Sequence, residues 1–126
     1  MKIEQAIWKN TGEWIKKKSG DPCDKAQLVL VFGETFLLKN PDPLKKISVM
    51  YPAAQIFGCS TAGDISGTEV LDNSIVATAI YFESTTVKIA CRDIGKIQDS
   101  FNIGRELGSC LDKEGLVHAF VLSDGL

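Results

Sequence analysis

From Ala54 to Gly67 the chain reads Ala-Gln-Ile-Phe-Gly-Cys-Ser-Thr-Ala-Gly-Asp-Ile-Ser-Gly, and this stretch decides how the rest is interpreted. The apolar run 54–57 predicts a buried strand, which breaks at Gly58 into small polar residues. Glycines at 58, 63 and 67 let the backbone adopt positive φ and approach a ligand closely. The stretch therefore predicts a strand followed by either a ligand-binding loop or an ordinary turn whose hydroxyls bond their own backbone.

The residues before this stretch have the spacing of a βαβ unit. Residues 26–32 form a near-continuous apolar run, which is typical of a strand covered on both faces. Pro41 and Pro43 predict the start of a helix of about ten residues, which ends near Tyr51. This order predicts two parallel strands joined by a helical crossover.

The N-terminal region is expected to form a strand and then a helix. Residues 2–8 favour a strand, although the run is short. Thr11 is a candidate N-cap for a helix in which Trp14 and Ile15 face inward. The lysines at 16–18 would lie at the end of this helix, where its dipole favours cations.

The second half of the chain predicts a hairpin, a helix and a last strand. Residues 73–82 and 86–91 are β-branched runs separated by three residues, a length that favours a hairpin. Asp99 and Ser100 are expected to cap a third helix, and residues 116–122 are expected to form the last strand. The inner stripe of that helix would be Phe101, Ile103, Leu107 and Leu111.

These elements together predict an α/β (or α+β) fold. We expect a layered, mixed sheet of about six strands with about three helices, including a βαβ unit and an antiparallel hairpin. Polar loops at 33–35, 58–61 and 123–125 follow three of the strands. If those strands are parallel, the loops meet at one edge, where open α/β sheets bind ligands.

Composition limits the class of protein. At 126 residues we expect one domain, 1–126, or a piece of one, with 44% hydrophobic and 24% charged residues, as in globular proteins. The net charge of −2 and the dispersed lysines disfavour nucleic acid as a partner. The start of the chain has no apolar signal segment, and no apolar run approaches the roughly 18 residues of a membrane span, so we expect a cytoplasmic protein without a membrane partner.

The cysteines and the one histidine do not predict a metal site. Cys23, Cys59, Cys91 and Cys110 are far apart and form no Cys-x-x-Cys pair. We expect reduced thiols that serve mainly as small core residues. His118 is the single histidine, so zinc would need a ligand spacing that the sequence does not have.

Enzyme motifs are approximated but incomplete. Gly58 and Gly63 have the glycine spacing of a phosphate-binding loop, but Asp64 stands where the lysine is needed. Ser60 follows a strand as in a nucleophile elbow, yet His118 would lie at the opposite edge of the sheet. We therefore assign no catalytic residue, and the enzyme alternative that stays open is Cys59 as a nucleophile or redox thiol.

Four segments resemble the FIST N-terminal domain: residues 57–65, 73–82, 99–100 and 118–126. Their order and spacing agree across essentially the whole chain. The resemblance implies a cytoplasmic sensory domain of signal-transduction proteins that binds small ligands such as amino acids. Some family members are associated with haem and nitric-oxide sensing, so haem is the alternative cofactor.

The resemblance also indicates where a ligand would bind. A ligand carboxylate would meet backbone N–H groups of the 58–64 loop, while Asp64 or Asp124 would pair with an ammonium group. The positions that carry over from the family, with Asp64 added, are Gly58, Cys59, Ser60, Thr61, Gly63, Asp64, Ser123, Asp124 and Gly125.

Family members continue beyond Leu126 with more of this domain and a C-terminal FIST domain. We therefore expect this chain to be the N-terminal part of a FIST N-terminal domain, with a sheet edge or apolar face left uncovered. Such surfaces favour self-association, which predicts a homo-oligomer. The expected partners are a small-molecule ligand and either a downstream signalling protein or the C-terminal FIST domain.

Overall fold

The computed structural model describes residues 1–9, 12–17, 24–93 and 100–123. The chain consists of two compact units, Met1–Val87 and Lys88–Leu126, which are described separately below. Strands and helices of the α/β type are present, so the predicted fold class is confirmed. Among the described residues, no helix combines the length and the apolar character needed to cross a membrane.

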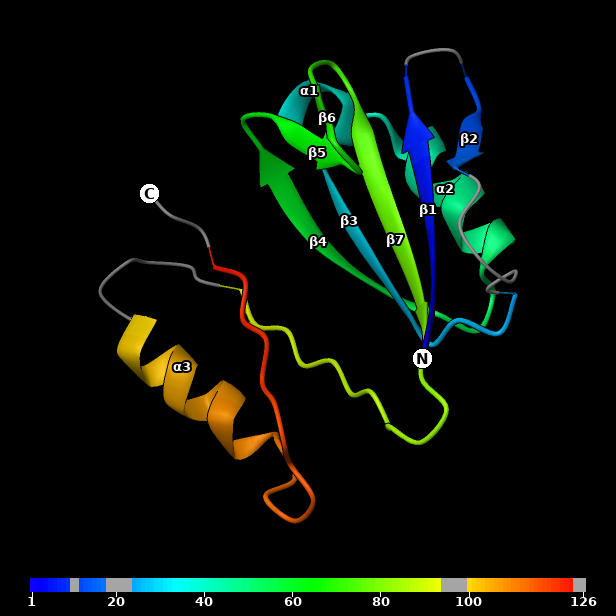
Figure 1. Ribbon diagram of the computed structural model, residues 1–126. Coiled ribbons are helices and arrows are strands. Elements are labelled where there is room, and N and C mark those ends of the chain that lie inside the picture. Colours follow the sequence, from blue (N-terminus) through cyan, green and yellow to red (C-terminus); the bar gives the residue numbers. More distant parts are fainter. Residues whose placement is uncertain (10–11, 18–23, 94–99, 124–126) are drawn as a thin grey trace. The chain divides into compact units, whose positions relative to one another are not determined.

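The first unit is built on a five-stranded mixed sheet with the strand order β2-β1-β7-β3-β4 (Figure 1). Its central strand, β7, pairs antiparallel with both β1 and β3, whereas β3 and β4 are parallel. The five strands are β1 (Lys2–Trp8), β2 (Trp14–Lys17), β3 (Leu28–Glu34), β4 (Gln55–Thr61) and β7 (Ile75–Tyr81).

Two helices, α1 (Thr35–Leu38) and α2 (Pro41–Met50), connect β3 to β4, which confirms the βαβ prediction. The side chain of Asn40 accepts a 3.0 Å hydrogen bond from the backbone N–H of Asp42 and so caps α2. Proline is favoured at this helix start because its missing N–H would have no intrahelical partner there. The short helix α1 was not predicted.

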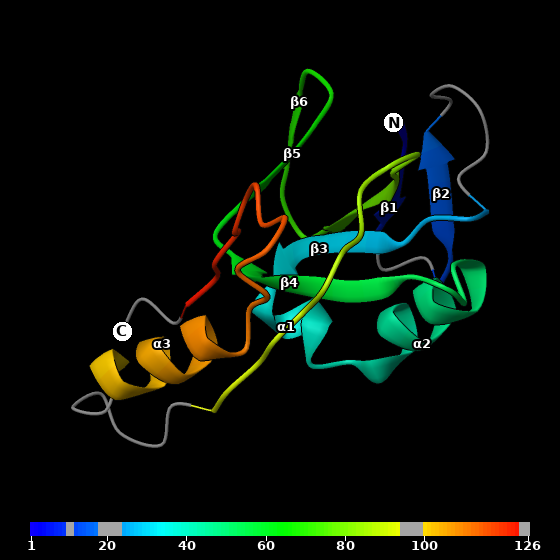
Figure 2. The same cartoon turned by 90° about the horizontal axis from the view of Figure 1, so that it is seen from below.

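The main core lies between the sheet and these two helices. Figure 2 shows α1 and α2 on the same side of the sheet. Val29 and Val31 of β3 are buried there together with Leu37 of α1 and Ile47 of α2. Alternate residues of β3 are only half-buried. The strand is therefore fully covered on one face and not, as expected from the sequence, on both faces.

A small antiparallel hairpin covers part of the other face. It consists of β5 (Asp64–Ser66) and β6 (Glu69–Leu71), and Gly67 in its turn has a φ of +64°. Leu71 packs in a second buried cluster with Ile7 of β1 and Val76 of β7. The hairpin therefore belongs to the first unit and follows β4 directly.

The helix expected after residue 11 is wrong, because Trp14–Lys17 form strand β2 and pair with β1. The indole rings of Trp8 and Trp14 lie in register and meet edge to face with centroids 5.7 Å apart. Ile15 points away and is exposed. This aromatic cross-strand contact accounts for a strand where local signals favoured a helix. Thr11 and Lys18 lie outside the described residues.

The predicted hairpin is also wrong in its second half. Residues 73–82 do contain a strand, β7, but residues 86–91 form no strand. Both edges of β7 are already paired, with β1 on one side and β3 on the other. No hydrogen-bonding edge of β7 is left for the following segment.

In the second unit, the third helix is confirmed as α3 (Ser100–Ser109). Of its predicted inner stripe, Ile103, Leu107 and Leu111 are half-buried, whereas Phe101 is 78% exposed. The last strand is wrong, because residues 116–122 have no regular secondary structure. Asp99 lies outside the described residues.

The expected core role of the cysteines is wrong for three of them. Cys59, Cys91 and Cys110 are exposed and form no disulfide, and Cys23 lies outside the described residues. Cys110 Sγ accepts a 3.4 Å hydrogen bond from the guanidinium of Arg92. These thiols therefore face solvent rather than fill the core.

Candidate ligand-binding pocket

The carboxyl ends of β3 and β4 lie side by side. Their parallel register places Glu34 opposite Thr61. Helix α1 leaves this edge at Thr35, and a two-residue turn, Ala62-Gly63, leads from β4 into β5. The parallel strands β3 and β4 therefore end at one sheet edge, as expected, but residues 58–61 belong to β4 and form no loop there.

A surface pocket of about 690 Å³ opens at this edge. Three segments of the first unit line it: residues 34–36 with Lys39, residues 61–64, and residues 71–73. Asn73, in the connection from β6 to β7, has a φ of +49°, a conformation that asparagine tolerates better than most residues. The pocket is thus lined by the end of the βαβ unit and by the segment that leads from the small hairpin into β7.

Asp64 is the most deeply buried charged residue of the pocket, with 5% of its surface exposed. Thr61 Oγ1 donates a 2.6 Å hydrogen bond to Asp64 Oδ1, and Ser74 Oγ donates a 3.4 Å hydrogen bond to Oδ2. Burying a carboxylate is costly unless such donors replace water. Each carboxylate oxygen therefore has a hydroxyl donor, one from the end of β4 and one from the residue before β7.

The pocket lining carries more negative than positive charge. Its lining residues include three acidic residues, Glu34, Asp64 and Asp72, and one basic residue, Lys39. Within the described ranges, none of these four side chains takes part in an ion pair. The pocket can therefore offer both an acidic and a basic partner to a ligand.

Thr61, Gly63 and Asp64, three of the predicted site residues, lie together in this pocket. The predicted break at Gly58 is wrong, because β4 continues to Thr61 and Gly58, Cys59 and Ser60 are paired with β3. These three residues are not among those that line the pocket, and their role as ligand contacts stays a prediction.

Gly58 has a structural explanation. A Cβ at this position would overlap the carbonyl oxygen of Val31 on β3. Glycine is needed here because two neighbouring strands approach closely. The backbone at Gly58 does approach another group closely, as the sequence suggested. That group is the adjacent strand β3 and not a ligand.

The remaining predicted positions belong to the second unit. Ser123 is exposed. Asp124 and Gly125 lie outside the described residues. Their part in a binding site stays a prediction.

Five residues of the lining lie outside the segments 33–35 and 58–64 that the sequence indicated: Phe36, Lys39, Leu71, Asp72 and Asn73. The polar residues 33–35 mark the end of a strand, and the turn of helix that follows them is the one signal that points toward Phe36 and Lys39. Asp72 could not be found in that way, because it follows β6, a strand that the sequence did not predict.

The described residues contain no group of three or more His, Cys, Asp or Glu side chains placed to hold a metal ion. Phe36, which also lines the pocket, is 74% exposed. The groups that could contact a ligand are thus carboxylates, hydroxyls, one ammonium group, one amide and an aromatic ring.

Comparison with protein families identifies the family of this chain. The family model of the FIST N domain matches residues 27–126. No curated protein and no solved structure matches the chain. The matched range includes the whole βαβ unit and every residue that lines the pocket.

Proposed function

We propose, from the premise that this chain belongs to the FIST N domain family of signal-transduction sensory domains, that it senses a small polar metabolite of the amino-acid type. The proposed ligand site is the pocket at the carboxyl ends of β3 and β4. We further propose that the domain works in the cytoplasm and passes the binding signal to a downstream signalling protein or to a C-terminal FIST domain.

The observation that carries this proposal is the arrangement around Asp64. Its buried carboxylate accepts hydrogen bonds from two hydroxyl donors, and Asp64 is one of the residues that line the pocket, where it is the proposed partner of a ligand ammonium group. Lys39, in the same lining, offers a partner for a ligand carboxylate. An amino acid carries these two complementary groups.

The hydrogen bonds available in the pocket are strong enough for ligand binding in the micromolar range. A hydrogen bond to a charged group contributes about 1.5–3 kcal/mol, so two or three such bonds support micromolar binding after ordering costs. The position also supports the proposal, because open α/β sheets place ligands outside the carboxyl ends of their strands.

A thermal-shift screen of the purified protein against amino acids and small dicarboxylates tests the proposal. A ligand at 100 times its dissociation constant adds about 2.7 kcal/mol to the free energy of unfolding. For a domain of this size that is a rise of several degrees in Tm. Including haem in the same screen, with an absorbance scan, tests the cofactor alternative.

Two variants make the screen specific to the pocket. Asp64→Asn is expected to abolish the Tm shift, because it removes the buried negative charge. Asp24→Asn is the matched control, since Asp24 is exposed and lies outside the pocket. A ligand that stabilises Asp64→Asn as much as the unmodified protein would show that the site lies elsewhere.

Two further expectations stay predictions. Light scattering at micromolar concentration tests the homo-oligomer, and a monomer would contradict it. Alkylation of Cys59 as a function of pH tests the thiol alternative. The exposure of Cys59 favours reaction with small reagents.

A further inference from the structure

We propose that the pocket selects ligands with a net positive charge, so that a basic amino acid binds in preference to a neutral or acidic one. This inference rests on the proposed function, because it names the charge class of the ligand at the same site.

The balance of charges in the lining is the first argument. A zwitterionic amino acid would use Lys39 for its carboxylate and one of the three acidic side chains for its ammonium group. Two acidic residues of the lining would then be left without a counter-charge. A second positive group on the ligand side chain supplies the missing partner, whereas a ligand carboxylate would add repulsion.

The environment of Asp64 is the second argument. Its partners, Thr61 and Ser74, supply hydrogen bonds but no positive charge. Asp64 is 95% buried, so its interaction with a cation is weakly screened by solvent and by salt. A cationic ligand gains more from this group than a neutral hydrogen-bond donor of the same shape does.

The third argument is the aromatic ring at the pocket wall. Phe36 is 74% exposed and lines the pocket. The face of an aromatic ring attracts ammonium and guanidinium groups, with gains of about 0.5–1 kcal/mol at exposed sites. It also provides apolar surface for the alkyl stem of a basic side chain.

The size of the pocket is compatible with such a ligand. Its volume of about 690 Å³ lies within the range of small-molecule sites, roughly 300–1,000 Å³. This volume is large enough for a basic amino acid.

Titration calorimetry with L-arginine, L-citrulline and L-glutamate tests the inference. Citrulline is the matched probe, because a neutral urea group replaces the guanidinium with little change in shape. We expect L-arginine to bind at least tenfold more tightly than L-citrulline and L-glutamate to bind most weakly. The affinity for L-arginine should also fall as the salt concentration rises.

Variants of the more accessible acids complete the test without removing the buried carboxylate. Glu34→Gln and Asp72→Asn, combined, are expected to bring the arginine-to-citrulline affinity ratio close to one. Asp24→Asn, outside the pocket, is expected to leave that ratio unchanged. Circular dichroism of each variant confirms that the fold is retained.

The outcomes distinguish the two proposals. Binding of L-citrulline or L-glutamate as tightly as L-arginine overturns the charge selection but leaves the sensory pocket standing. If none of these probes binds and no amino acid in the thermal screen does, the proposed function itself fails. If the selectivity is unchanged in the double variant, these carboxylates are not its source and the inference is overturned.

Discussion

Thr61 Oγ1 and Asp64 Oδ1 are joined by a 2.6 Å hydrogen bond across the turn that links β4 to β5. The bond connects the last residue of the parallel βαβ unit to the first residue of the small hairpin. The same contact therefore orients the buried carboxylate of the pocket and closes the turn.

Thr61→Val is expected to lower the free energy of unfolding by about 1–3 kcal/mol, because it leaves one oxygen of Asp64 without its closest donor. Valine has nearly the same shape, so packing changes little. Urea denaturation measures the effect. Thr68→Val, in the exposed turn of the hairpin, is the control and should change stability by less than about 0.5 kcal/mol. Equal effects at both positions would contradict the role of this hydrogen bond.

Gly58→Ala is expected to destabilise the first unit strongly, by about 3 kcal/mol or more, since the Cβ would displace the backbone of β3. Gly104→Ala in α3 is the contrast, because a Cβ at 104 meets no atom within 4 Å. There the helix propensity of alanine predicts a neutral or slightly stabilising change, up to about 1 kcal/mol. Urea denaturation of both variants, compared with the unmodified protein, measures the two effects. An unchanged midpoint for Gly58→Ala would refute the close approach of β4 to β3.

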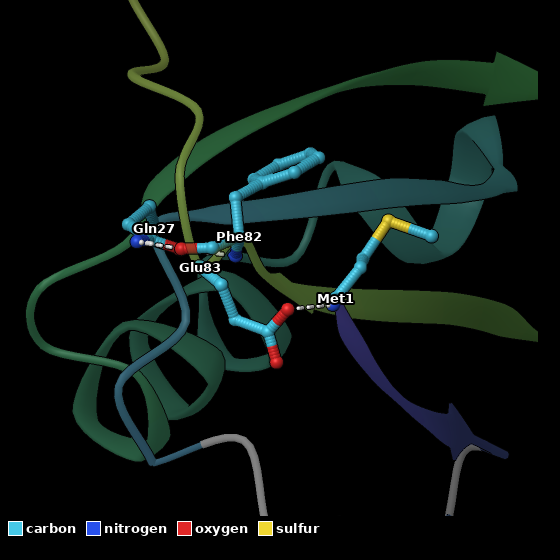
Figure 3. Close-up of polar contacts among 4 residues, drawn as sticks. All are labelled: Met1, Gln27, Phe82 and Glu83. Carbon is cyan, nitrogen blue, oxygen red and sulfur yellow. Dashed lines mark hydrogen bonds and ion pairs between the residues drawn. The ribbon is translucent and has the colours of Figure 1, made fainter.

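Gln27 and Phe82 are joined by two hydrogen bonds, which are drawn in Figure 3. The Gln27 side chain donates to the Phe82 carbonyl at 2.9 Å and accepts from the Phe82 N–H at 2.8 Å. Removing both bonds by Gln27→Ala is expected to cost about 1–3 kcal/mol of stability. Gln55→Ala, which removes one exposed 3.3 Å bond to Val87, is the smaller change. If the two variants unfold at the same denaturant concentration, the two hydrogen bonds between Gln27 and Phe82 do not stabilise the fold more than the single bond of Gln55 does.

Glu83 lies beside the N-terminal ammonium group of Met1, at 2.8 Å (Figure 3). That hydrogen bond and charge hold the pKa of Glu83 below its ordinary value of 4.5. Because the folded-state pKa is lowered, the stabilisation is present above about pH 4.5 and is lost as the pH falls through the lowered pKa. An NMR titration of the Glu83 carboxyl carbon measures this directly.

Acetylation of the N-terminus is the matched control for that titration. It removes the positive charge and is expected to return the Glu83 midpoint toward the ordinary value. A midpoint that does not move on acetylation would show that the Met1 ammonium group is not the cause.

Local sequence signals were sufficient for the βαβ unit. Each element of this unit is specified by residues close together in the sequence. They are the apolar run before Gly33, the prolines at 41 and 43, and the apolar residues 54–57. The structure confirms the two strands, the helix and the parallel pairing of the strands, although β4 runs on to Thr61 and none of its residues is fully buried, unlike the buried strand that was expected. The sheet edge with the pocket follows from this topology, and Thr61, Gly63 and Asp64, predicted from the resemblance and the loop, line that pocket.

Long-range pairing explains what could not be predicted. The lysines after Trp14 suited a helix end, but the contact of Trp14 with Trp8 lies in a strand pair. The prediction of a hairpin after β7 is wrong because β7 pairs with β1, from the start of the chain, instead of with the segment that follows it. Register between distant strands leaves no local signal in the sequence. For the same reason Asp72 escaped notice as a pocket residue.

The most direct test of the sensory pocket is a nitrogen–proton NMR titration of the protein with L-arginine. The amide signals of Lys39, Thr61, Asp64 and Asn73 are expected to shift with one common dissociation constant. Signals of α3, in the second unit, are expected to shift far less. Shifts confined to residues outside the pocket, or no saturable shift with this or any other amino acid, would contradict the account.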